Sequence, residues 1–266
     1  MPEKLDSTPV PDFAEQIRLS GRVFVVLGAG NGIGRQVSHA LAQAGAKVGC
    51  VDRDPDLAKH VANEIGGHPL TGDITQRHDV ARLFGEAREA IGAVSGLVDI
   101  VGMPHLGPLA ALDDARWASQ FDLVLNHAFL AMQIGGAAIA DTGGGSMVFV
   151  ASMAGLVSLP GQAAYGAAKA ALIHLVATMG SELGPARVRV NAVAPGFVRT
   201  PRLNTMLNEP QWAALGKHIP LGAAASPSEI AGPILFLASD LASHVTGQTL
   251  LVDGGIARTV HLPKLW

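Results

Sequence analysis

Short apolar segments recur at regular intervals along the chain. Six of them are hydrophobic at nearly every position, which is typical of strands that are buried on both faces of a sheet. A weaker candidate covers 68–71. The six are Val23–Leu27, Val48–Val51, Val94–Val101, Met147–Ala151, Val188–Val193 and Thr249–Val252. The pattern therefore predicts a sheet of seven strands.

Longer segments with helical spacing separate these strands. In each of them apolar residues return every three or four positions, as expected for a helix with one face on a core. They are Ile33–Ala44, Pro55–Ile65, Gln76–Ile91, Asp113–Ala140, Ala163–Leu183 and Pro227–Ala238. Helical crossovers join parallel strands. The alternation predicts an α/β fold, a doubly wound parallel seven-stranded sheet of the Rossmann type, in a single domain over 21–255.

Three stretches lie outside this alternation. Residues 1–20 contain acidic residues and prolines, and we expect a loose N-terminal arm. Residues 256–266 form a C-terminal tail whose apolar side chains could pack on a neighbouring subunit. The stretch near 200–227 has no clear strand and several apolar residues. A connection of that length in a small domain is typical of a substrate lid.

Charge and cysteine content narrow the class of protein. The net charge of −3 gives no basic footprint, so we expect no nucleic-acid partner. The single cysteine, Cys50, cannot form an internal disulfide, which favours a reducing, cytoplasmic location. We identify neither a secretion signal nor an uninterrupted membrane span. The histidines do not have metal-ligand spacing, and we expect no metal.

A glycine-rich turn follows the first predicted strand. Gly28, Gly32 and Gly34 allow a tight turn, a close approach of the backbone to a pyrophosphate, and packing of helix on strand. Backbone amides near Asn31 and Ile33, at the start of the next helix, can bind phosphate oxygens. Turns and helix packing also use glycine, so this loop alone leaves the dinucleotide site open.

Acidic residues end the second and third predicted strands. Asp52 can accept hydrogen bonds from the adenosine ribose and repel a 2′-phosphate, which favours NAD over NADP. Arg53 beside it keeps NADP as the less favoured alternative. Asp52 could equally be a helix cap. Asp73, followed by Ile74, could orient the adenine or cap the helix that begins near Gln76.

One tyrosine and one lysine are candidates for proton transfer. Tyr165, the only tyrosine of the chain, and Lys169 are four residues apart and share a helix face. A fixed ammonium lowers the pKa of a nearby phenol toward working pH, which would let Tyr165 act as acid or base. Ser152 ends the strand before this helix and lies on the expected ligand side of the sheet. Taken alone, a Tyr/Lys pair can also be an ordinary surface contact.

Together these motifs resemble the short-chain dehydrogenase/reductase family. The similarity runs from about Gly21 to Gly255 and includes the glycine turn, Ser152 before Tyr165-x3-Lys169, the segment 191–196 and the ending 246–255. The resemblance implies that Tyr165 exchanges the substrate's hydroxyl proton and that Ser152 binds the substrate oxygen. It implies that Lys169 binds the nicotinamide ribose and lowers the tyrosine pKa. Asn126 would hold a water of the proton relay.

The same resemblance implies a cofactor, a reaction and an assembly. Pro195, Gly196, Val198 and Thr200 would surround the nicotinamide of NAD. The reaction would be hydride transfer between NAD(H) and a secondary alcohol or ketone, in a homotetramer. A homotetramer agrees with the apolar faces of two long predicted helices. Apolar side chains expected around the pocket favour an apolar cyclic substrate; they are Met153, Leu159, Pro160, Met206 and Trp212, with Gln162.

One motif departs from the family pattern. Where the family has Asn-Asn-Ala-Gly after the fourth strand, this chain has Asp99-Ile100-Val101-Gly102. We expect altered cofactor affinity rather than lost activity. Two other functions stay open: a catalytically silent nucleotide-sensing or scaffold protein, and an NAD-retaining lyase or epimerase. The intact proton-transfer residues argue against the silent protein.

Overall fold

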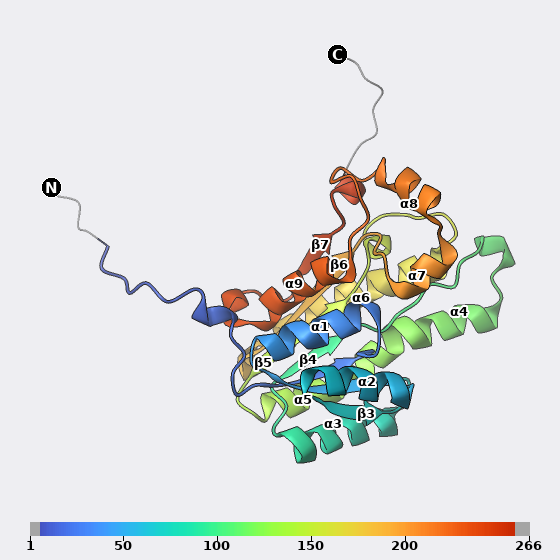
Figure 1. Ribbon diagram of the computed structural model, residues 1–266. Helices are drawn as coiled ribbons and strands as arrows, with labels where there is room; N and C mark the ends of the chain where they lie inside the picture. The colour runs from blue at the N-terminus through green and yellow to red at the C-terminus, as the bar shows by residue number, and fades with distance from the viewer. Residues whose placement is uncertain (1–5, 259–266) are drawn as a thin grey trace.

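Seven parallel strands form one sheet in the order β3-β2-β1-β4-β5-β6-β7 in the computed structural model, which describes residues 6–258 (Figure 1). The strands are β1 (Val23–Leu27), β2 (Lys47–Asp52), β3 (His68–Thr71), β4 (Gly96–Asp99), β5 (Gly145–Val150), β6 (Val188–Pro195) and β7 (Thr249–Val252). All neighbours pair in parallel. The predicted doubly wound α/β sheet is confirmed.

Helices cover both faces of the sheet. They are α1 (Gly32–Gln43), α2 (Pro55–Ile65), α3 (Arg77–Ile91), α4 (Asp114–Phe121), α5 (His127–Ala140), α6 (Ala163–Glu182), α7 (Pro201–Met206), α8 (Glu209–Gly216) and α9 (Pro227–Ala238). Alternate side chains of β1 enter two different cores. Val25 packs in the core under α3, α5 and α6, whereas Phe24 packs in the core under α1, α2 and α9. Burial on both faces explains the uniformly apolar strands.

The strand order reverses between β1 and β4. The chain first builds outward from β1 through β2 to β3 and then returns to place β4 on the other side of β1. Leu27 pairs with Asp99, so the turn after β1 and the loop after β4 leave the sheet side by side. A ligand in an open α/β sheet binds at such a switch point, beyond the carboxyl ends of the strands.

The predicted helix 113–140 is interrupted. It consists of α4, a π-helical turn over Asp122–Asn126, and α5. By length and composition the run Asp114–Ala140 could cross a membrane, which the sequence analysis did not identify. Half of its most apolar window is buried inside the protein, and α5 contributes Leu130 and Met132 to the core. It is therefore a core helix.

The two ends and the 200–227 stretch differ in part from expectation. Leu19 is fully buried, and its backbone amide donates to Ala44, so the N-terminal segment joins the core before residue 20. Upstream of it, the segment from residue 6 extends away from the body (Figure 1). The stretch 200–227 is not irregular throughout, because α7 and α8 occupy much of it. Of the predicted tail, residues 259–266 lie outside the described part.

Candidate functional site

A cleft of about 890 Å³ opens at the carboxyl ends of the strands, at the switch point. The glycine turn, the loops after β4, β5 and β6, and helix α7 contribute its walls. Among the residues that line it are Asn31, Gly32, Ile33, Ser152, Tyr165, Pro195, Gly196, Val198 and Thr200. Nine of the predicted site residues therefore share one concave surface.

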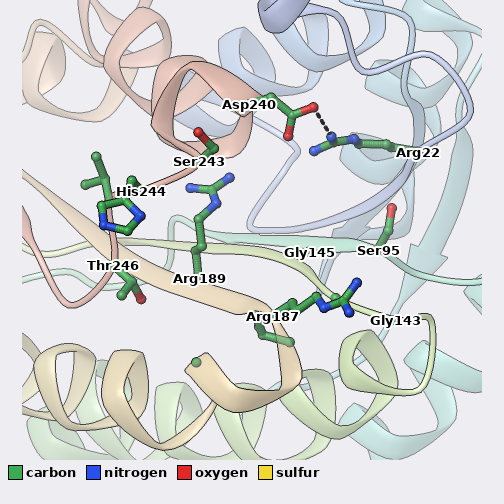
Figure 2. A pocket seen from close by; sticks show the side chains of 14 residues that line it. Arg22, Ser95, Gly143, Gly145, Arg187, Arg189, Asp240, Ser243, His244 and Thr246 are labelled. Carbon is green, nitrogen blue, oxygen red and sulfur yellow. Dashed lines mark hydrogen bonds and ion pairs between the residues drawn. The ribbon is translucent and has the colours of Figure 1, made fainter. Parts of the chain in front are cut away.

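A second hollow, of about 640 Å³, lies at the amino ends of the strands (Figure 2). Two of its arginines already have partners: Arg22 pairs with Asp240 at 2.6 Å, and Arg189 donates to the backbone carbonyls of residues 237–239 at the end of α9. These arginines serve the packing of α9 and the following turn. The chemistry of the predicted site lies at the opposite end of the sheet.

The turn after β1 requires glycine for two different reasons. Gly28 has a φ of +79°, which L side chains rarely adopt. A Cβ at Gly34 would lie 1.9 Å from the carbonyl oxygen of Gly28, so α1 can approach the strand only without a side chain there. Asn31 caps α1 by accepting from the Gly32 amide at 2.7 Å. Phosphate oxygens fit the free amides of this first helical turn.

Asp52 holds this turn from the neighbouring strand. Its Oδ2 accepts from the Gly30 amide at 3.0 Å, and its Oδ1 accepts from the Asp54 amide at 3.1 Å. The cap of α2 is Asp54, not Asp52. The half-buried carboxylate of Asp52 thus lies beside the glycine turn after β1. Arg53 next to it is exposed.

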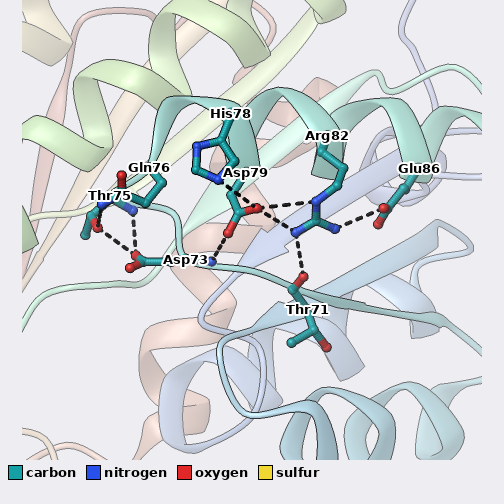
Figure 3. Close-up of polar contacts among 8 residues, drawn as sticks. All are labelled: Thr71, Asp73, Thr75, Gln76, His78, Asp79, Arg82 and Glu86. Atoms are coloured by element: carbon teal, nitrogen blue, oxygen red, sulfur yellow. Dashed lines mark hydrogen bonds and ion pairs between the residues drawn. The ribbon is translucent and has the colours of Figure 1, made fainter.

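The loop after β3 is a network of polar contacts (Figure 3). Asp73 accepts from the amide and hydroxyl of Thr75 at 2.9 and 2.7 Å, and its own amide donates to Asp79 at 2.7 Å. The bond from Arg82 is the largest cause that holds the pKa of Asp79 below its usual value. Asp73 caps this turn rather than α3 itself, which starts after Gln76 without a side-chain cap. The network fixes the turn beside buried Ile74, after the carboxyl end of β3.

Ser152 and Tyr165 meet at the reacting end of the cleft. Ser152 follows β5, and its hydroxyl accepts from the Ala154 amide at 3.1 Å. Tyr165 is the third residue of α6, and its side chain lies near that of Ser152 in the wall of the cleft. Burial raises the pKa of Tyr165 to about 12, and the nearby Ser152 side chain acts in the opposite direction. The two hydroxyls can bind a single substrate oxygen between them.

Lys169 lies behind these hydroxyls and is 1% exposed. Its Nζ donates to the Val150 carbonyl at 2.6 Å and lies 5.8 Å from the centroid of the Tyr165 ring. Burial lowers the pKa of Lys169 to about 8, and the charge of Asp99 partly opposes that shift. The expected lowering of the Tyr165 pKa by this lysine is wrong for the chain alone. Burial of the phenol dominates, because the ammonium is directed to a strand carbonyl.

Asn126 does not join the other three side chains. It is exposed, and its amide donates to Asp122 at 2.6 Å. Val124 instead is fully buried in a cluster with Tyr165 and Ala168. The prediction of Asn126 as a relay residue assumed an unbroken helix. The π turn that ends at Asn126 changes which residues face inward.

Sequence reasoning missed a buried pair beside the lysine. Nε2 of His127 lies 2.9 Å from Oδ2 of Asp99, and both side chains are almost completely buried. The signal was present as the aspartate that replaces the family's first asparagine after β4. Its partner, 28 positions further on, could not be identified without the helix register.

The segment after β6 crosses the cleft opposite the glycine turn. Thr200 caps α7 by accepting from Leu203, and its methyl carbon would lie 3.5 Å from a Cβ at Gly32. Val198 forms a bridge with Ala225 that holds the segment in place. The segment therefore lies close to the glycine turn, and both line the same cleft as Tyr165.

The substrate end of the cleft is mostly apolar. Of the side chains expected there, Met153, Leu159, Gln162 and Met206 line it. Pro160 is not part of the lining, and Trp212 is buried under Arg199, 5.2 Å from the guanidinium carbon. His105 and Arg202 also line the cleft, whereas no aspartate or glutamate does among the described residues.

Comparison with known proteins places this geometry in a family. A family described as "Enoyl-(Acyl carrier protein) reductase" matches residues 28–257. The chain is 35% identical to 2-(S)-hydroxypropyl-CoM dehydrogenase 3 of Xanthobacter autotrophicus, over 90% of this chain and 98% of that one. It is 36% identical to galactitol 2-dehydrogenase (L-tagatose-forming) of Cereibacter sphaeroides, over 92% and 98%.

A solved structure agrees with this result. The structure of a 7α-hydroxysteroid dehydrogenase complexed with NADH and 7-oxo glycochenodeoxycholic acid matches with a TM-score of 0.86 at 32% identity, over 91% of this chain and 96% of that one. Family match, sequence relatives and fold all point to dehydrogenases and reductases that act on alcohols and ketones. The chain belongs to the short-chain dehydrogenase/reductase family of NAD(P)-binding oxidoreductases.

Proposed function

We propose that the protein transfers a hydride between NAD(H) and a secondary alcohol or ketone, with Tyr165 as the acid and base. The observation that carries the proposal is that the Ser152 and Tyr165 side chains line one cleft together with the glycine turn. A substrate oxygen held by both hydroxyls presents its carbon to the space below Pro195–Thr200. A nicotinamide supplies hydride chemistry when bound there.

The chain's own residues would supply positioning and one proton. In alcohol oxidation Tyr165 must first lose its hydroxyl proton, which burial opposes by raising its pKa to about 12; its oxygen then takes the proton of the substrate hydroxyl while the carbinol hydrogen leaves as hydride to the nicotinamide. In ketone reduction the Tyr165 hydroxyl returns that proton to the substrate oxygen. Ser152 donates to the substrate oxygen in both directions and stabilises its negative charge. The buried ammonium of Lys169 adds a positive potential near that oxygen.

The proposed cofactor is NAD rather than NADP. Asp52 supports this choice, because its carboxylate lies beside the glycine turn and would repel a 2′-phosphate. Arg53, which is exposed and follows Asp52 in the sequence, is a cation that could favour NADP. Initial rates with each cofactor test the proposal, and a kcat/KM that is higher with NADP would overturn it.

The proposed substrate is apolar, with a ring that fits between the loop after β4 and α7. An acidic substituent away from the carbonyl would suit the same cleft. Arg202 lines it and has no carboxylate partner among residues 6–258; its guanidinium lies against the sulfur of Met103. Because no aspartate or glutamate among residues 6–258 lines the cleft, the electrostatic potential at its mouth favours an anion.

The proposed assembly is a cytoplasmic homotetramer. Apolar rings are exposed on two neighbouring helices. Trp117 of α4 is 42% exposed and Phe129 of α5 is 43% exposed. Cys50 is buried and burial raises the pKa of its thiol to about 11, which suits a reducing compartment. Light scattering at micromolar concentration tests the assembly, and a monomer would contradict it.

Turnover with a panel of secondary alcohols and NAD, followed by NADH absorbance, tests the reaction. The Tyr165→Phe variant should lose turnover and keep NAD binding, since it removes only the hydroxyl. Unchanged turnover in this variant would exclude Tyr165. No NADH from any substrate, with NAD bound, would instead favour a silent protein or an NAD-retaining lyase or epimerase.

A further inference from the structure

Asp99 and His127 form a polar pair in the interior of the protein. Asp99 is the last residue of β4 and His127 the first of α5, and they are 2% and 1% exposed. Nε2 of His127 lies 2.9 Å from Oδ2 of Asp99. Buried charges are costly unless they are paired and hydrogen-bonded. Neither side chain lines the cleft, so the pair needs another explanation than substrate contact.

The contacts of the pair define its charge. The second oxygen of Asp99 accepts from the Val101 amide at 3.0 Å. Nδ1 of His127 is buried and has no hydrogen-bond partner among residues 6–258. A ring with protons on both nitrogens would leave one buried N–H unsatisfied. The geometry therefore fits a neutral ring that donates from Nε2 to a negative Asp99, so the pair carries one net negative charge.

The positive charge that faces this pair is Lys169. Its ammonium is buried and donates to Val150. Gly102, three residues after Asp99, passes so close that a Cβ there would lie 2.8 Å from Nζ. Burial lowers the pKa of Lys169, and Asp99 is the charged group that raises it. The titratable groups around the ammonium are Tyr165 on its own helix, Asp99 from β4 and His127 from α5.

The π turn presents an apolar side chain to this region. Val124 packs with Tyr165 and Ala168 and lies with the ammonium beside Gly102, whereas Asn126 is exposed. The charge that acts on Lys169 comes from Asp99 at the end of β4. We propose that Asp99 and His127 are positioning residues that act as an internal counter-ion, fixing the charge and place of Lys169 beneath the substrate cleft. This inference rests on the proposed oxidoreductase function.

The test measures Lys169 directly and does not depend on turnover. Lysine Cε is labelled with ¹³C, the Lys169 signal is assigned by its loss in Lys169→Met, and its titration is followed by NMR. In Asp99→Asn the signal should titrate about one pH unit lower or more, a tenfold loss of proton affinity per unit, because a nearby negative charge is gone. In the pH profile of kcat, the step that requires charged Lys169 should move to lower pH together with the NMR titration.

Matched variants separate this effect from simple damage to the fold. Asp141→Asn, the same change at the exposed far end of α5, should leave the titration unchanged. His127→Leu removes the donor to Asp99 and should lower the Lys169 titration. His127→Gln keeps a donor and should restore part of the shift. An Asp99→Asn protein that is folded and titrates like the wild type overturns the proposal.

Two further outcomes keep the proposal falsifiable. If the Asp99 variants do not fold, the wild-type titration decides: the counter-ion predicts that Lys169 stays charged at pH 7, and a lysine that is neutral there overturns it. If the Asp99→Asn shift occurs while no substrate is turned over, the counter-ion stands and the proposed oxidoreductase function fails.

Discussion

The backbone amide of Gly30 donates to Oδ2 of Asp52 at 3.0 Å, which joins the glycine turn after β1 to the end of β2. A Cβ at Gly30 would lie 2.6 Å from that same oxygen, so the carboxylate packs directly on the turn. One side chain can therefore set both the shape of the turn and the choice of cofactor.

Asp52→Asn should weaken the preference for NAD. The amide retains an oxygen for Gly30 but loses the charge that repels a 2′-phosphate. We expect the ratio of kcat/KM for NAD over NADP to fall about tenfold, the size of an interaction of roughly 1.4 kcal/mol. Initial rates with both cofactors measure it. Asp56→Asn, an exposed change in the first turn of α2, is the control and should leave the ratio unchanged.

Gly34→Ala should damage the cofactor turn. The new methyl would lie 1.9 Å from the Gly28 carbonyl oxygen, and backbone on both sides has to move. We expect a loss of about 1–3 kcal/mol in the free energy of unfolding, as for overpacked cores, together with weak NAD binding. Urea unfolding and NAD titration measure both. Gly85→Ala, where a Cβ meets nothing within 4 Å, should be neutral or stabilising.

The stability of the protein should depend on pH through Lys169. Its pKa falls from 10.5 to about 8 on folding, so between these pH values the unfolded chain binds more protons than the folded one. The free energy of unfolding therefore rises with pH across that window. Above pH 10 the opposite sign applies to Tyr165, whose folded pKa is about 12. The Tyr165 contribution is lost as pH rises from 10 to 12.

A comparison of urea unfolding at pH 7.5 and 9.5 isolates the lysine. Lys169→Met keeps an apolar chain of similar length and removes the charge, so its stability should gain less between the two pH values than that of the wild type. The difference should be on the order of 1–2 kcal/mol, from about 1.4 kcal/mol per pKa unit. Equal pH dependence in the two proteins would show that the lysine titrates normally.

Much of the fold could be predicted from the sequence, because apolar residues recur at different intervals in strands and in helices. Val23–Leu27, Pro55–Ile65 and Thr249–Val252 have the bounds that the pattern predicted. The ends of α2 are set by local chemistry: the Asp54 side chain accepts from its first amides, and Gly66 ends it with a φ of +65°. Such signals are contained in neighbouring residues and need no tertiary structure.

The features that the sequence did not reveal share a different cause. Asn126 is exposed and His127 is buried where a single π turn changes the helix register by part of a turn, and nothing in the local composition indicates that turn. Likewise, the sequence spacing places Lys169 beside Tyr165 on a helix face. It does not show that the Val150 carbonyl accepts a hydrogen bond from the ammonium, or that burial is the main influence on the pKa of the phenol. Both depend on neighbours that are distant in sequence.

Arg202→Gln should separate charged from neutral substrates. The guanidinium lies at the cleft mouth against Met103 without a carboxylate partner among residues 6–258, so its charge is free to act on a bound anion. For a ketone with a remote carboxylate we expect kcat/KM to fall about fivefold to tenfold, as for an exposed charge pair of roughly 1 kcal/mol. For the matching methyl ester the rate should not change.

Companion measurements test whether the charge of Arg202 causes the effect. Arg202→Lys should recover most of the rate with the acid, because charge rather than shape carries the effect. Lys217→Gln removes an exposed cation after α8 that does not line the cleft, and it should leave both substrates unaffected. A change confined to the KM for NAD would instead assign Arg202 to the cofactor phosphates, whose turn adjoins Pro201. Equal losses with acid and ester would show that Arg202 only shapes the wall, and the preference for acidic substrates would be wrong.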